Sequence, residues 1–267
     1  MKKVAILIDS TLSLGRDLLR GIVQYANVQG PWLFLHIDRL GDNKNMQRNL
    51  FARLTEWQPD GIIIREEKVH PDFLELGVPL IVSTHHTPPV NQVANLIADD
   101  LSIGQLGYSY FHQKGFRSFG FCGYKKFNWS NERYQGFSRQ LKENGIKVPL
   151  YESSIRQIKN HPDKELEVLG QWLQSLPKPL AVMGCDDRRC QQIAEACKLL
   201  EISIPSAVAV LGVHNEDIIC ETAYPPLSSI ALNTKNTEID TNSNTPSDIR
   251  RTEGSNIVKA AIIGTNK

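Results

Sequence analysis

Short apolar runs alternate with amphipathic stretches along most of the chain, and this alternation constrains the fold more than any other feature. Each run is hydrophobic almost throughout, which is typical of parallel strands covered on both faces. A strand–helix repeat of about 30 residues indicates βαβ units with right-handed crossovers. The runs predicted as strands are Val4–Ile8, Leu33–Ile37, Gly61–Ile64, Leu80–Val82, Leu96–Ala98, Phe119–Cys122, Leu180–Met183 and Val208–Gly212.

The stretches between these runs have helical periodicity. Apolar residues recur every three or four positions, which predicts one buried stripe on each helix. Capping side chains precede some of the stretches, because a side-chain oxygen can accept a hydrogen bond from an unpaired N–H of the first turn. The predicted caps are Asp100 with Ser102, Ser130 and Asp187, and one predicted stripe runs through Leu14, Leu18, Ile22 and Ala26.

The strand–helix pattern restarts after about residue 115, which favours two α/β lobes over one large sheet. We predict an N-terminal lobe over residues 1–114 and a C-terminal lobe over residues 115–230. Residues 231–267 are an atypical polar tail that we expect to be truncated or partly disordered. Residues 234–254 are too polar to offset the entropy cost of ordering, whereas Ile257–Ile263 could form one further element.

Composition excludes several classes of protein. Hydrophobic residues make up 41% and charged residues 22% of the chain, a mix typical of globular domains. The 30 Lys and Arg residues against 29 Asp and Glu give a net charge of +1, so the chain as a whole is not an electrostatic nucleic-acid binder. It has no secretory leader and no apolar stretch of about 20 residues, which predicts a cytoplasmic protein with no membrane partner.

The 5 cysteines form no metal-binding or disulfide pattern. Their number is odd and no C-x-x-C pair occurs, so we expect buried reduced thiols. His85 and His86 follow a predicted strand, but no further ligand accompanies them, and a surface loop is expected. We therefore predict no metal site.

Motifs for cofactor binding and catalysis are missing from the sequence. It has no phosphate loop, no dinucleotide-binding G-x-G-x-x-G after the first strand and no G-x-S-x-G nucleophile elbow. Neither two opposed carboxylates nor a Ser–His–Asp set can be assembled at the strand ends. We predict no cofactor, no catalytic residue and no enzyme activity.

Polar side chains follow the predicted strands, at the edge of a parallel sheet where ligands usually bind. Arginine offers paired N–H donors, aspartate accepts from vicinal hydroxyls, and an indole face packs against the C–H side of a sugar ring. For any single member, a helix cap or a surface salt bridge is the alternative role. The set suits a neutral polyhydroxylated ligand, and the predicted ligand-binding residues are Arg16, Arg65, Trp129, Arg133, Asp186 and His214.

Several segments, taken in order, resemble the effector domain of xylose operon regulators. They include L-S-L-G-R-D-L-L-R-G-I-V-Q-Y-A at residues 12–26, N-W-S-N-E-R-Y-Q-G-F at 128–137 and P-P-L-S-S-I at 225–230. The resemblance extends from about residue 3 to residue 233. Those regulators join a sugar-binding domain of the lactose/galactose-repressor (LacI/GalR) type to an arabinose-regulator-type (AraC-type) helix-turn-helix domain.

The resemblance implies a two-lobed, type I periplasmic-binding-protein-like α/β fold, with parallel sheets flanked by helices. It implies a small sugar, a pentose such as xylose, held in the cleft between the lobes. Arg133 falls where the family has its sugar-binding arginine, and Asp186 where it has a hydroxyl-binding Asn, Asp or Thr. Arg16 and Arg65 occupy positions expected to contact the sugar. His214 departs from the family, which usually has an aspartate there.

The resemblance further implies a sugar-sensing transcriptional regulator that forms a homodimer. Operator DNA would be bound only through a helix-turn-helix domain that this chain does not contain. The change of composition after residue 233 leads us to expect a truncated or frame-altered product. Two alternatives stay open: a stand-alone sugar-binding protein for transport, which would need a secretory leader, and a sugar-modifying α/β enzyme, which would need a catalytic constellation.

Overall fold

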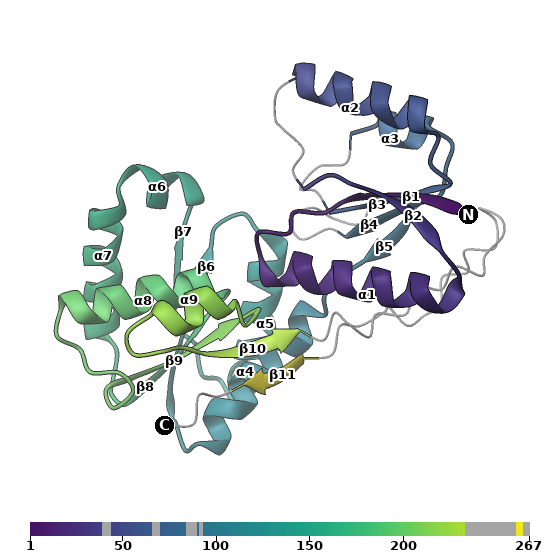
Figure 1. The fold of residues 1–267 in the computed structure, drawn as a ribbon. Coiled ribbons are helices and arrows are strands. Elements are labelled where there is room, and N and C mark those ends of the chain that lie inside the picture. Colours follow the sequence, from purple (N-terminus) through teal and green to yellow (C-terminus); the bar gives the residue numbers. More distant parts are fainter. Residues whose placement is uncertain (39–43, 66–69, 84–89, 91–92, 233–259, 264–267) are drawn as a thin grey trace. The chain divides into compact units, whose positions relative to one another are not determined.

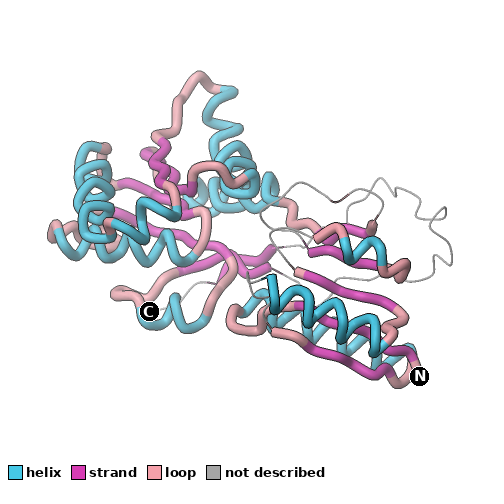
Figure 2. Tube along the Cα trace, turned by 90° about the horizontal axis from the view of Figure 1, so that it is seen from above, coloured by secondary structure: helices cyan, strands magenta, loops and turns pink. Residues whose placement is uncertain are grey.

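The computed structural model describes residues 1–38, 44–65, 70–83, 90, 93–232 and 260–263, with the backbone alone for 44–47 and 260–263. These residues form two compact units, each an α/β arrangement with helices on both faces of a sheet (Figures 1 and 2). The first unit contains residues 1–98 and the second contains residues 99–232 together with the strand at 260–263. The predicted α/β class is confirmed.

The first unit is built on a five-stranded parallel sheet with the strand order β2-β1-β3-β4-β5. The predicted strands of this region are confirmed, with ends that differ by at most two residues. Its elements are β1 (Lys2–Leu7), α1 (Ser13–Gln29), β2 (Trp32–His36), α2 (Lys44–Trp57), β3 (Gly61–Ile64), α3 (Asp72–Glu75), β4 (Leu80–Ser83) and β5 (Ala94–Leu96).

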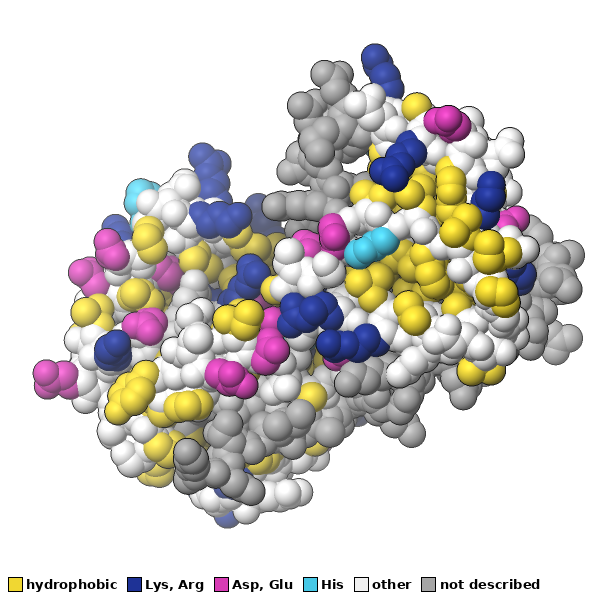
Figure 3. Space-filling model, viewed as in Figure 1, with side chains coloured by type: hydrophobic (Ala, Val, Ile, Leu, Met, Phe, Trp, Pro, Cys, Tyr) yellow, Lys and Arg dark blue, Asp and Glu magenta, His cyan; other side chains and the backbone are white. Residues whose placement is uncertain are grey.

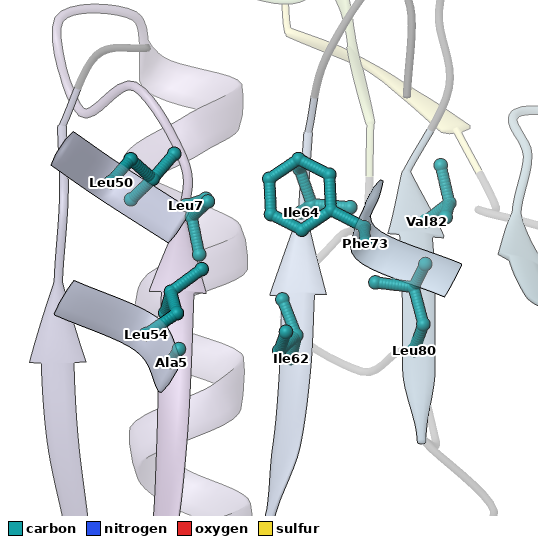
Figure 4. Packing of buried hydrophobic residues seen from close by; sticks show 9 residues of the cluster. All are labelled: Ala5, Leu7, Leu50, Leu54, Ile62, Ile64, Phe73, Leu80 and Val82. Carbon is teal, nitrogen blue, oxygen red and sulfur yellow. The ribbon is translucent and has the colours of Figure 1, made fainter. Parts of the chain in front are cut away.

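The core of the first unit explains why its strands are hydrophobic without alternation. Leu50 and Leu54 of α2 pack with Leu7 and Ile64 on one face of the sheet (Figure 4). Neighbouring strand residues such as Ile6 point to the other face, where α1 covers them. Both faces are dry, so both sets of side chains must be apolar. The buried stripe of α1 consists of Gly15, Leu18, Ile22 and Ala26, so Gly15 replaces the predicted Leu14.

The second unit is built on a six-stranded sheet with the order β11-β10-β9-β8-β6-β7, parallel except for the antiparallel pair β10–β11. Its elements are α4 (Asp100–Gln113), β6 (Ser118–Tyr124), α5 (Asn128–Glu143), β7 (Leu150–Ser153), α6 (Ile155–Asn160), α7 (Pro162–Ser175), β8 (Leu180–Gly184), α8 (Asp187–Leu199), β9 (Val208–Val213), α9 (Asp217–Thr222), β10 (Ser228–Leu232) and β11 (Ala260–Ile263).

The strands β7 and β10 were not predicted, whereas β11 lies within the segment 257–263 that was expected to form a further element. The three predicted helix caps are wrong. Asp99, not Asp100, caps α4 by accepting from the backbone N–H of Ser102. Ser130 lies inside α5, where its Oγ accepts from the backbone N–H of Tyr124 at 3.0 Å. The predicted disorder at 234–254 and the His85–His86 loop fall outside the described residues.

The helix α4 belongs to the second unit because it packs backbone to backbone against α5. A Cβ atom on Gly136 would lie 2.0 Å from the carbonyl oxygen of Leu101, and one on Gly104 would lie 2.1 Å from that of Arg133. Only glycine permits so close an approach. The structure therefore divides the chain after residue 98, whereas the sequence predicted the division after residue 114.

Charges of both signs are interspersed over the face shown in Figure 3, in keeping with the net charge of +1. Among the described residues, no helix combines the length and the apolar character that crossing a membrane requires. Neither observation identifies a partner.

The glycine contact between α4 and α5 gives a testable prediction. Replacing Gly136 with alanine should lower the free energy of unfolding by about 2 kcal/mol or more, because the new methyl group overlaps a backbone oxygen that cannot move aside. Urea unfolding followed by circular dichroism measures the change. Gly61→Ala is the control, since its Cβ would meet Pro79 at an ordinary 3.5 Å. Equal stability of the two variants would contradict the close contact.

Candidate functional site

The strands β6, β8 and β9 lie side by side and parallel, so their carboxyl ends meet at one edge of the second sheet. Residues that follow these three ends therefore come together, although they are far apart in the sequence. Four of the predicted ligand-binding residues are in this group. They are Trp129 and Arg133 after β6, Asp186 after β8 and His214 after β9.

Arg133 is the centre of this group. Its side chain is completely buried, with 0% exposure. Its Nε donates to the Asp100 carboxylate at 2.7 Å, and its Nη1 donates to the backbone oxygen of Cys185. Desolvation raises the pKa of Asp100, and the adjacent guanidinium opposes that rise. A charge buried this deeply needs such partners, because an unpaired ion would cost several kcal/mol.

The third partner of Arg133 is His214. The Nη2 group of Arg133 lies 3.2 Å from Nε2 of His214. A guanidinium can only donate hydrogen bonds, so Nε2 must be the acceptor and the ring proton must be on Nδ1. The contact therefore fixes one neutral tautomer of the imidazole. The structure joins two predicted ligand-binding residues directly to each other.

Trp129 contacts the same arginine. The guanidinium carbon of Arg133 lies 4.9 Å from the centre of the indole ring, a cation–π geometry. The ring also meets Tyr124 and Phe127 with centroid separations of 6.0 and 5.9 Å. Trp129 is 4% exposed. The indole thus supports the arginine in this structure, and its contact with a sugar stays a prediction.

Asp186 caps α8, a role that the sequence assigned to Asp187. Its Oδ1 accepts from the backbone N–H of Arg189 at 2.8 Å, and the Tyr124 hydroxyl lies 3.5 Å from the same oxygen. Desolvation raises the pKa of Asp186, while Arg133 and Arg189 oppose the rise. Asp186 is therefore near Arg133 as predicted, but one of its oxygens is already used by the helix.

Asp187 has a different set of partners. Its Oδ1 accepts from the Ser229 hydroxyl at 2.6 Å, and its Oδ2 accepts from the backbone N–H of Glu216 at 2.8 Å. Desolvation raises the pKa of Asp187 to about 7, and the two hydrogen bonds oppose the rise. A Cβ atom on Gly212 would lie 2.1 Å from Asp187 Oδ1, so β9 must carry a glycine beside this carboxylate.

The other two predicted residues lie in the first unit. The Nη1 of Arg16 donates to the backbone oxygen of Thr11 at 2.8 Å, at the turn between β1 and α1. Arg65 follows β3, and its backbone N–H donates to the Leu7 oxygen at 2.9 Å. Burial lowers the pKa of Arg65, and Asp9 opposes the shift. Arg65 directly follows the carboxyl end of β3, whereas Arg16 lies in the first turn of α1, and a role of either residue in ligand binding stays a prediction.

A second buried ion pair supports the other face of the second sheet. Arg189 donates to Glu165 at 3.1 Å, and its guanidinium lies between the rings of Tyr124 and Tyr151. The Ser153 hydroxyl also donates to Glu165, at 2.9 Å. These contacts join α8, α7 and β7, and we regard the pair as structural.

Sequence reasoning missed two residues of the group. Asp100 was interpreted as a helix cap, and nothing in its local pattern pointed to Arg133. Tyr124 ends β6 two residues beyond the predicted strand, so its place at the sheet edge was overlooked. The five cysteines are buried free thiols, as predicted. Among the described residues no set of three or more His, Cys, Asp or Glu side chains is arranged to bind a metal ion.

Asp187 makes stability depend on pH. Its folded-state pKa of about 7 exceeds the ordinary 3.8, so the folded protein holds this proton over a range where the unfolded chain has released it. Stability contributed by Asp187 is complete below pH 4 and declines as the pH rises through 7, by at most about 1.4 kcal/mol per pH unit.

Asp187→Asn removes the titration and keeps the shape of the side chain. Urea unfolding of both proteins between pH 5 and 8 should therefore show the variant gaining stability relative to the native chain up to about pH 7. A difference that does not change with pH would contradict the assignment.

This chain is similar in sequence to several known proteins. The periplasmic binding protein-like domain family matches residues 108–237.

The xylose operon regulatory protein of Escherichia coli is 22% identical over 242 residues, covering 86% of this chain and 59% of that protein. Its Haemophilus influenzae counterpart is 26% identical over 143 residues, or 52% of this chain and 37% of that protein. The E. coli regulator GntR is 21% identical over 86% of this chain and 69% of its own length.

The chain spans about three-fifths of the length of the E. coli xylose operon relative. Among solved structures, the xylose-binding transcription activator XylR has a TM-score of 0.71 and 19% identity, over 87% of this chain and 59% of that one. An Alkaliphilus metalliredigens regulator complexed with D-xylulofuranose has a TM-score of 0.65 and 16% identity, over 88% of this chain and 86% of that one. A transcription regulator-like protein from Staphylococcus haemolyticus has a TM-score of 0.70 and 16% sequence identity, over 98% of this chain and 96% of that one. The fold is therefore periplasmic-binding-protein-like.

Proposed function

Because this chain is related in sequence to xylose operon regulatory proteins over 86% of its length, we propose that it is the sugar-sensing part of a transcriptional regulator. The observation that carries the proposal is the buried Arg133 group. It brings Arg133, Asp186 and His214 together after the adjacent strands β6, β8 and β9, at the edge where α/β sheets bind ligands.

The chemistry of the group suits a small sugar. A guanidinium has five N–H donors, and the three described bonds of Arg133 leave two N–H groups, which we propose as donors to a hydroxyl or a ring oxygen of the sugar. Asp186 supplies a carboxylate that accepts from hydroxyls. We also propose Arg16 and Arg65 of the first unit as ligand-binding residues, because each carries a guanidinium that can donate to a hydroxyl. The solved relatives that bind xylose and xylulofuranose favour a pentose.

Regulation would follow from differential binding. A sugar that binds one arrangement of the protein more tightly than another shifts the population toward the first. Moving such an equilibrium from about 1:99 to about 99:1 requires about 5.5 kcal/mol of differential affinity, which several charge-assisted hydrogen bonds can supply. The homodimer and the DNA-binding partner domain implied by the resemblance belong to the same proposal.

The described group favours binding over catalysis. His214 is the obvious general base, but its Nε2 accepts from Arg133 and so is not placed to take a proton from a substrate. Asp187 holds Ser229 and the backbone of Glu216 instead of opposing a second carboxylate across a substrate. The curated relatives are regulators, which agrees with this interpretation.

Binding can be measured directly. Isothermal titration calorimetry with D-xylose, D-xylulose, D-ribose, L-arabinose and D-gluconate should show saturable binding of at least one pentose. A thermal-shift assay should agree, because a ligand at about 100 times its Kd stabilises the folded state by about 2.7 kcal/mol. Purified protein should leave the pentose chemically unchanged. Absence of binding by every sugar, or turnover of one, would refute the proposal.

Arg133 should be essential for this binding. Arg133→Met alone leaves the Asp100 charge buried without its partner, which should cost about 3–5 kcal/mol of stability. Arg133→Met combined with Asp100→Asn removes the stranded charge and should recover much of that loss. Both proteins should bind the pentose at least about 100-fold more weakly, the loss expected for two charge-assisted hydrogen bonds.

Arg139→Met is the matched control. Arg139 lies on the same helix, is 64% exposed and pairs only with Glu143 at 3.3 Å among its described ion-pair partners. The Arg139→Met variant should bind the pentose with the same affinity as the native chain. A folded double variant that binds as tightly as the native chain would place the sugar elsewhere.

A further inference from the structure

The loop that carries His214 has an unusual backbone. His214 and the next residue, Asn215, have φ angles of +102° and +51°, in the region that favours glycine. A residue with a side chain is strained in this conformation, which persists only where its surroundings hold it. Some contact must therefore keep this loop in place, directly beside Arg133.

Three successive backbone amides of the loop are held by hydrogen bonds. The N–H of His214 donates to the Ile230 oxygen at 2.9 Å, as a continuation of the sheet. The N–H of Asn215 donates to Ser229 Oγ at 3.0 Å, and the N–H of Glu216 donates to Asp187 Oδ2 at 2.8 Å.

The two side chains that accept these bonds are themselves joined. The Ser229 hydroxyl donates to Asp187 Oδ1 at 2.6 Å, and both residues are almost completely buried. The carboxylate comes from the start of α8 and the hydroxyl from β10, so two elements act together on one loop. We call this arrangement the Asp187–Ser229 clamp.

We propose that Asp187 and Ser229 are positioning residues for sugar binding, which act by holding the loop at 214–216 so that His214 Nε2 accepts from Arg133. The inference rests on the proposed function of the Arg133 group. Without the clamp, the loop can relax toward ordinary negative φ angles and turn the imidazole away. Arg133 would then lose a partner, and the ring would lose the contact that fixes its tautomer.

A pair of serine variants separates positioning from general stability. Ser229→Ala removes the hydroxyl of the clamp. Ser153→Ala removes an equally buried hydroxyl that also donates to a carboxylate, Glu165 at 2.9 Å, away from the loop. Pentose Kd values from calorimetry should rise about tenfold or more in Ser229→Ala and change less than about twofold in Ser153→Ala. Equal Kd values in the two variants would overturn the proposal.

Glycine at position 215 provides a rescue. Glycine adopts a positive φ without strain, so Asn215→Gly should hold the loop geometry with less help from Ser229. The double variant Ser229→Ala with Asn215→Gly should recover to within about threefold of the native Kd. If Ser229 only supported the core, Asn215→Gly would not restore the pentose Kd. A double variant that binds as weakly as Ser229→Ala would therefore also count against the clamp.

The tautomer of His214 gives a readout that needs no ligand. Long-range ¹H–¹⁵N spectra of the histidine-labelled full chain, with His214 assigned by His214→Asn, should show a protonated Nδ1 and an unprotonated Nε2. Ser229→Ala should give a mixture of tautomers, and Asn215→Gly should reverse it. An unchanged spectrum in Ser229→Ala would overturn the proposal. If no sugar binds the native chain while the tautomer still responds, the proposed function fails and the control of His214 by the clamp stands.

Discussion

A buried positive charge organises the second unit. Arg133 is completely enclosed, and its partners come from the start of α4, the end of β8 and the loop after β9. A buried guanidinium without a charged partner would cost several kcal/mol, so the contacts from these three elements stabilise the unit together. The close contact of α4 with α5 brings Asp100 within reach. The need to pair the buried charge of Arg133 therefore influences both the packing of the second unit and the geometry of the candidate site.

The sequence predicted the sheets because a strand segment buried on both faces must be apolar, as β8 and residues 4–7 of β1 are. It missed β7 and β10, which are short and polar enough to resemble loops. It also assigned α4 to the N-terminal lobe, whereas in the structure this helix belongs to the second unit. The repeat length does not show which sheet a helix packs against, and that choice depends on two glycines whose purpose is visible only once α5 lies against them.

The neighbouring carboxylates Asp186 and Asp187 show where local patterns stop being informative. Either could cap α8, and a sequence pattern cannot distinguish them. The roles of the two carboxylates depend on residues far along the chain. Gly212 leaves space for the Asp187 side chain, and the Ser229 hydroxyl donates a hydrogen bond to it. The same holds for His214, whose role depends on a backbone conformation that its residue type does not predict. Positions at the strand ends were predictable, and their partners were not.

The indole of Trp129 lies against the guanidinium of Arg133 in the candidate site. Emission from an indole depends strongly on nearby ions and on the water around it. Any event that alters the surroundings of Arg133 should therefore change the colour or the brightness of this tryptophan. With Trp32, Trp57 and Trp172 replaced by phenylalanine, the fluorescence of Trp129 alone would report changes around Arg133 without an attached dye.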